Sequence, residues 1–301
     1  MIELALGLLA RSVAPLPFRW MRALGAPLAW FVGSILRVRR SHVEGALRRG
    51  GWRESARVAR GMYRGLGASV MELLWLSRRP TEALASVTSL EPASKRALDE
   101  ALARGRGAVL AASHTGNWEL AACAMARSLN LLVVTKPIRK QGFDRFMGRT
   151  RRAHGLELAP PEGALLPARE VLARRGCVAM LIDQVPALER HGIALDFLGA
   201  RALADRAPAA LAACTGAPLV VVAFHRDLRG AHVIRVLRVL YPPLRDRSAW
   251  IVRATREATS ALEAFVRKYP SEWLWLHKRW RAPRSSRPCL PGASSLHESH
   301  A

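Results

Sequence analysis

Acidic residues are scarce in this sequence. Its 301 residues include 23 Asp and Glu against 47 Lys and Arg, which gives a formal charge of +24. So large an excess predicts attraction to an acidic partner: nucleic acid, an anionic lipid surface or an acidic carrier protein. Because arginine outnumbers lysine, fork-like contacts with phosphate or carboxylate groups are favoured.

Cysteine is also sparse, and none of the four cysteines has CxxC or another metal-ligand spacing. Cys123, Cys177 and Cys214 lie within apolar runs, so we expect buried free thiols. The pattern offers no disulfide framework and suits a reducing compartment.

Long apolar runs are missing from the N-terminal region. The uncharged segment 23–36 has 14 residues, fewer than the ~18–20 that span a bilayer cleanly. No signal-peptide cleavage site follows the first apolar run. Flanking arginines together with Trp20, Trp30 and Phe31 predict that residues 1–36 contact a membrane surface, whereas core helices broken by prolines are the alternative.

Short apolar runs alternate with amphipathic helical patterns over the rest of the chain, and no internal repeat is visible. The runs at 107–113, 131–135 and 177–183 predict buried strands between helices. We therefore expect one α/β domain at 37–281, with a mixed central sheet flanked by helices. The Pro- and Ser-rich tail at 282–301 is predicted to be disordered.

The stretch AASHTGNWELAA at 111–122 has the strongest potential for chemistry. His114 follows the carboxyl end of a predicted strand, where α/β proteins place their ligands. If Glu119 lies in the first turn of the next helix, the imidazole can fold back onto its carboxylate and act as a general base. Gly116 permits a tight turn, and Asn117 could bind a developing oxyanion of the substrate.

Ordinary structural roles remain open for the same residues. Glu119 can complement the helix dipole, and His114 can be a hydrogen-bonded loop residue. A zinc site is disfavoured, because the sequence has no HExxH motif and no second histidine near His114.

The segment HTGNWE resembles the H-x4-D/E motif of the lysophospholipid and glycerolipid acyltransferase superfamily. More narrowly, it resembles the lauroyl/myristoyl (late) acyltransferases of lipid A biosynthesis. Further blocks are similar to that family in the same order, and the resemblance reaches about Arg281. They are VVTKP (133–137), FMGRTRRAHG (146–155), CVAMLIDQ (177–184), the Phe-Gly block with its helix and strand (195–224), and PSEWLWLHKRWR (270–281).

This resemblance implies an O-acyltransferase without a metal or organic cofactor. His114, oriented by Glu119, would deprotonate a hydroxyl of a lipid A precursor or related glycolipid as it attacks an acyl thioester. The implied donor is the acidic acyl carrier protein. The implied location is the bacterial inner membrane, with the catalytic domain on its cytoplasmic side.

Several basic and polar positions match the family's blocks. Lys136, Arg149 and Arg151 are expected to bind phosphates of an anionic glycolipid, with solvated or structural charge as the alternative. Asp183 and Gln184 end a strand and would order the site or bind a sugar, or merely cap a loop. The tryptophans and His277 of the last block are expected to be structural, with contact between its aromatic and basic residues and the lipid interface as the alternative.

Other functions fit parts of the pattern. The same chemistry could serve a glycerophospholipid, an ornithine lipid or a phosphoinositide mannoside, and the loop-like segment 183–197 carries no signature that selects the acceptor. A basic non-catalytic membrane protein is a second class. A nucleic-acid-binding protein is disfavoured, because no recognition motif or basic-aromatic single-strand pattern is present.

Overall fold

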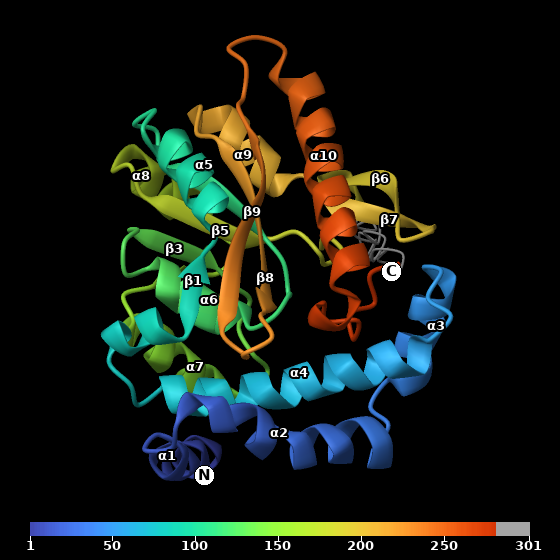
Figure 1. The fold of residues 1–301 in the computed structure, drawn as a ribbon. Coiled ribbons are helices and arrows are strands. Elements are labelled where there is room, and N and C mark those ends of the chain that lie inside the picture. Colours follow the sequence, from blue (N-terminus) through green and yellow to red (C-terminus); the bar gives the residue numbers. More distant parts are fainter. Residues whose placement is uncertain (281–301) are drawn as a thin grey trace, which may run out of the picture.

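The computed structural model describes residues 1–280 (Figure 1), so the tail at 282–301 lies outside the described residues. The α-helices are α1 (Ile2–Val13), α2 (Met21–Trp30), α3 (Arg40–Arg49), α4 (Ser55–Leu76), α5 (Pro92–Leu102), α6 (Trp118–Met125), α7 (Gln141–Ala153), α8 (Leu165–Ala173), α9 (Ala207–Thr215) and α10 (Arg247–Lys268). Short 3-10 or π segments are η1 (Phe18–Trp20), η2 (Phe31–Ile35), η3 (Thr81–Ser86), η4 (Glu189–His191) and η5 (Pro270–Glu272).

A seven-stranded sheet forms the centre of the domain, in the order β1-β9-β8-β2-β5-β3-β4. All neighbouring pairs are parallel except β8 and β9, which are antiparallel, so the predicted mixed α/β sheet is confirmed. Its strands are β1 (Thr88–Leu90), β2 (Ala108–Ala112), β3 (Leu131–Val134), β4 (Glu157–Ala159), β5 (Cys177–Leu181), β8 (Leu219–Arg226) and β9 (His232–Leu240).

Both faces of the sheet are covered, as the continuous apolar runs of its inner strands predict. Along β2, Val109 and Ala111 belong to one buried cluster with residues of α8, α9 and α10. Leu110 and Ala112 belong to a second cluster with residues of α5, α6 and α7. This alternation follows from the two-residue period of a strand, and it leaves the strand ends free to carry polar groups.

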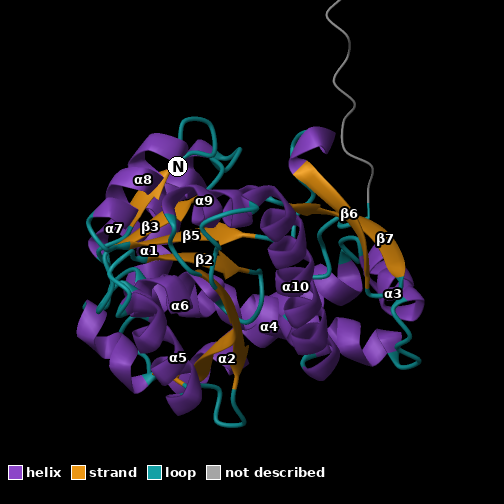
Figure 2. Ribbon diagram, turned by 90° about the horizontal axis from the view of Figure 1, so that it is seen from above, coloured by secondary structure: helices purple, strands orange, loops and turns teal. Residues whose placement is uncertain are grey.

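Two expectations were wrong. The segment 183–197 is not loop throughout, because β6 (Gly192–Phe197) pairs antiparallel with β7 (Ala200–Asp205). Figure 2 shows this hairpin beside α10, apart from the main sheet. Cys214 is exposed rather than buried, because it lies on the outer face of α9, whereas Cys123 and Cys177 are buried free thiols.

The N-terminal helices α1 and α2 pack on α4, which crosses the lower part of Figure 1. No helix within residues 1–280 has the length and apolar character needed to cross a bilayer. The first 38 residues nevertheless leave many large apolar side chains exposed. They include Leu4, Leu8, Leu9, Trp20, Trp30, Phe31, Ile35 and Leu36.

Close backbone contact between α2 and α4 depends on glycine. A Cβ atom on Gly67 would lie 2.3 Å from the carbonyl oxygen of Gly25, and one on Gly25 would lie 2.4 Å from the carbonyl carbon of Gly67. Neither neighbour is a side chain that could rotate away, so any larger residue must separate the helices.

We predict that Gly67→Ala lowers the free energy of unfolding by about 1–3 kcal/mol, because overpacking outweighs the gain in helix propensity. The matched control is Gly45→Ala on α3, where an added Cβ meets nothing within 4 Å. Urea unfolding should show no loss for this control, and a gain of up to about 1 kcal/mol. Equal effects in the two variants would contradict the helix contact.

Candidate active site

A tight loop of residues 113–117, here called the catalytic loop, joins β2 to α6. It follows the carboxyl end of β2, as predicted. Gly116 has a φ of +54°, and a Cβ there would lie 2.9 Å from the carbonyl oxygen of Phe224, so glycine is required for both reasons. Asn117 caps α6 by accepting a hydrogen bond from the backbone N–H of Leu120.

His114 is held by Asp183, not by Glu119. The Nδ1 atom of His114 lies 2.8 Å from Oδ1 of Asp183, and its backbone N–H donates to Oδ2 at 2.9 Å. Trp273 donates its indole N–H to the same Oδ2 at 2.9 Å. The expected His114–Glu119 pairing is therefore wrong in its geometry.

Sheet register explains why Asp183 is the partner. The neighbouring parallel strands β2 and β5 align Ala112 with Leu181, so His114 and Asp183 each follow two residues later at the same sheet edge. Asp183 is fully buried. Burial alone would raise its pKa, but the charge and hydrogen bonds of His114 hold the pKa well below the ordinary range.

Glu119 forms a bidentate ion pair with Arg151 instead. Arg151 donates from Nε at 2.8 Å and from Nη2 at 2.6 Å, and the indole N–H of Trp118 donates to the same carboxylate. Burial alone would lower the pKa of Arg151, but the hydrogen bonds and charge of Glu119 raise it. The arginine expected to bind phosphate is thus already paired within the protein.

A large apolar cavity of about 1030 Å³ opens beside the catalytic loop. This exceeds the roughly 300–1,000 Å³ of ordinary ligand pockets. Its apolar walls come mainly from β2, β3, α6 and α7 and include Leu110, Val133, Phe143 and Met147. Of the predicted site residues, the structure brings six to this cavity: His114, Asn117, Glu119, Lys136, Arg151 and Gln184.

Two predicted residues lie elsewhere. Asp183 is behind His114, where it contacts the imidazole rather than the cavity. Arg149 is exposed and pairs with Glu3 of α1 rather than facing the cavity, because it lies on the opposite face of α7 from the buried Arg151. Neither position was evident from motif spacing.

The C-terminal segment contributes more to the site than expected. Trp273, which was expected only to pack, holds Asp183, and Leu274 donates its backbone N–H to the carbonyl oxygen of His114. The ring of His277 packs edge-on against His114, with centroids 4.3 Å apart. Burial and the neighbouring His114 lower the pKa of His277 to about 4, so this imidazole is neutral near pH 7.

His114, Asp183 and His277 also form a group whose ligand atoms lie within 4.8 Å of one another. In this arrangement Nδ1 of His114 is already hydrogen-bonded to the carboxylate of Asp183. Asp183 and His277 do not line the cavity, so the group has no open approach from it. The contacts present favour an oriented base over a metal centre.

Comparison with known proteins identifies the family of this chain. The sequence model described as bacterial lipid A biosynthesis acyltransferase matches residues 3–282. The chain belongs to this family. The phosphatidylinositol mannoside acyltransferase of Mycolicibacterium smegmatis is 32% identical over 195 residues, which cover 62% of this chain and 60% of the relative.

A protein of the same name from Mycobacterium tuberculosis is 30% identical over 194 residues, which cover 62% of this chain and 59% of the relative. The aligned regions thus span about three fifths of each relative. Family membership confirms the resemblance on which the sequence interpretation depended.

We predict that Asp183→Asn makes the free energy of unfolding depend less on pH in the acid range than it does in the wild type. The pKa of Asp183 is depressed on folding, so its contribution is present above the unfolded value of about 3.9 and is lost as the pH falls below it. Urea unfolding midpoints between pH 7 and pH 3 should fall less steeply in the variant than in the wild type.

The control for this prediction is Asp196→Asn on β6. This carboxylate is exposed, and its ion pair with Arg201 is long at 3.8 Å. Its midpoints should follow the wild-type slope. A wild-type slope in Asp183→Asn as well would contradict the assigned ionisation.

Proposed function

We propose that this chain is an O-acyltransferase that moves a fatty acyl chain from a thioester to a hydroxyl group of an envelope glycolipid. The observation that carries the proposal is the buried Asp183–His114 pair at the edge of a large apolar cavity. Family membership supports the same reaction class.

The contacts of His114 support a path for the proton in the proposed reaction. With Nδ1–H donating to Asp183, His114 keeps the lone pair of Nε2 for an incoming hydroxyl. As Nε2 takes the proton, the hydroxyl oxygen attacks the thioester carbonyl carbon to form a tetrahedral intermediate. Collapse breaks the C–S bond, and the imidazolium returns the proton to the thiolate.

The other residues of the site hold the substrate and the surrounding helices in place. The cavity wall holds the acyl chain away from water, and the Glu119–Arg151 pair ties α6 to α7 along that wall. The catalytic role of Glu119 stays a prediction, without a contact to His114. The oxyanion role of Asn117 also stays a prediction and would use the second N–H of its amide, because the first donates to Glu72.

Charge supports the proposed partners. Lys136 is exposed at the cavity and has the freedom to bind a phosphate of an anionic acceptor. The formal charge of +24 favours an acidic donor such as acyl carrier protein, and it favours the anionic surface of the inner membrane. The activity for which the relatives are named favours a phosphoinositide mannoside as acceptor, with a lipid A precursor as the alternative.

We predict that His114→Ala lowers acyl transfer by about 100- to 10,000-fold and that Asp183→Asn has an effect of up to about 10,000-fold. Purified protein would be incubated with acyl carrier protein and coenzyme A thioesters, each with phosphoinositide mannoside, underacylated lipid A and glycerophospholipid acceptors. Mass spectrometry of the lipids would identify both substrates.

The control is Cys214→Ser, an exposed position on α9, which should retain wild-type turnover. His114→Ala and Asp183→Asn must both keep the wild-type circular dichroism spectrum. Wild-type turnover in His114→Ala would refute the mechanism, and no transfer from any donor by the wild type would refute the function.

Residues 1–36 are proposed to contact the membrane through their exposed apolar side chains. Replacing Trp30 and Phe31 with Glu should lower flotation with anionic vesicles by at least about tenfold, because both side chains lose favourable burial. The control replaces Leu228 and Leu244 with Glu; these two side chains are also apolar and are more exposed than Trp30 and Phe31, but they lie in loops flanking β9. Equal losses in both pairs would show that charge alone weakens binding.

A further inference from the structure

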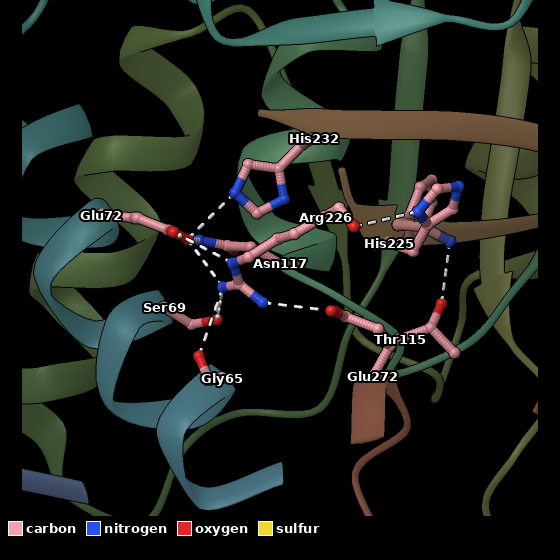
Figure 3. A network of polar contacts seen from close by, with 10 residues as sticks. Gly65, Ser69, Glu72, Thr115, Asn117, His225, Arg226, His232 and Glu272 are labelled. Carbon is pink, nitrogen blue, oxygen red and sulfur yellow. Dashed lines mark hydrogen bonds and ion pairs between the residues drawn. The ribbon is translucent and has the colours of Figure 1, made fainter. Parts of the chain in front are cut away.

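A second cluster of buried polar side chains lies beside the catalytic loop (Figure 3). Glu72 of α4 is fully buried at its centre. Its carboxylate accepts hydrogen bonds from Arg226 at 3.1 and 2.9 Å and from the side-chain amide of Asn117 at 2.8 Å. Nε2 of His232 lies 3.1 Å from the same carboxylate.

The carboxylate of Glu72 is ionised in this setting. Burial alone would raise its pKa, but the charges and hydrogen bonds of His232 and Arg226 lower the pKa to about 2. A buried charge with several hydrogen-bonding partners is confined to a narrow range of positions, because moving it would leave a charged group unpaired. Glu72 is therefore a rigid anchor between α4, β8 and β9.

The first connection from this anchor to the catalytic loop is Asn117. The side-chain nitrogen of Asn117 donates to Glu72, and its oxygen accepts from the backbone N–H of Leu120. Both ends of the amide are thus fixed, three residues after His114. The start of α6 cannot turn relative to α4 without breaking one of these bonds.

The second connection runs through Arg226 to the C-terminal segment. Nη1 of Arg226 is 3.3 Å from the side-chain carboxylate of Glu272. The backbone carbonyl oxygen of the same residue accepts a hydrogen bond from the backbone N–H of Gly116 at 2.8 Å. The next residue, Trp273, holds Asp183. The anchor thereby reaches the catalytic loop from both sides.

We propose that Glu72 is a positioning residue for acyl transfer, which fixes the catalytic loop through Asn117 and Arg226 so that His114 stays aligned with the reacting hydroxyl. This inference rests on the proposed function. A displacement of a base by about 1 Å can reduce a rate about 100-fold, so small movements of the loop matter more for turnover than for folding.

Two variants test the connection, and a third is the control. Glu72→Gln removes the charge and keeps the shape. Asn117→Ser keeps a capping oxygen for α6 but loses the amide that donates to Glu72. Because this amide also has a proposed oxyanion role, hydrogen exchange of the loop, rather than kcat, is the readout that remains informative if Glu72→Gln does not fold. The control is Glu91→Gln, which also breaks a carboxylate–arginine pair, with Arg235, but between α5 and β9 away from the loop.

We expect Glu72→Gln and Asn117→Ser each to lower kcat about 10- to 100-fold with KM within about twofold of the wild type. The double variant should lose less than the product of the two effects, because both act through one connection. Hydrogen exchange of peptides covering residues 113–120 and 272–274 should quicken in Glu72→Gln but not in Glu91→Gln, whose kcat should stay at the wild-type level.

Exchange is the readout that separates this inference from the proposed function. Unchanged exchange in both peptides, or multiplicative losses in the double variant, would overturn the positioning role. A fall in kcat for Glu91→Gln equal to that for Glu72→Gln would overturn it too, since general destabilisation would then account for both. If the wild type transferred no acyl chain while exchange changed as expected, the function would fail and the loop anchor would stand.

Discussion

The carboxylate of Asp183 is the point on which the arrangement of the candidate site depends. It receives the backbone N–H and the imidazole of His114 from one strand end, and the indole of Trp273 from the C-terminal segment. Three regions far apart in the sequence therefore meet at one buried charge. Because an unpaired charge in this position would be very costly, the three donors specify a single arrangement of these segments.

Around this pair, the polar groups divide into separate units. Glu119 and Arg151 form one ion pair beside the cavity. Glu72 and Arg226 form a second ion pair behind the catalytic loop. Each buried carboxylate has its own arginine or histidine, so none competes for His114. This separation lets the imidazole of His114 face a largely apolar cavity.

Much of the fold followed from local pattern. The continuous apolar runs at β2, β3 and β5 predicted inner strands. These predictions held because burial on both faces demands uninterrupted apolar residues. The hairpin of β6 and β7 was missed because its strands carry charged and small residues, so periodicity does not separate it from a loop.

The position of the site was also predictable, but its pairing was not. A histidine after a buried strand and before a helix start indicates the carboxyl edge of a sheet. Glu119 was the obvious partner because it is near in sequence. Asp183 is 69 residues away, and only the order of the strands reveals that β2 and β5 are neighbours.

The sequence by itself determined the fold class, the family and the loop that carries His114. It did so through apolar periodicity, glycine at a required turn and a series of ordered motifs, all of which are local properties. Only the tertiary structure decided which carboxylate holds the imidazole, which arginines are already paired, and how Glu72 supports the loop. Those choices depend on strand register and on burial, because a charge removed from water must find its partner in space and not along the chain.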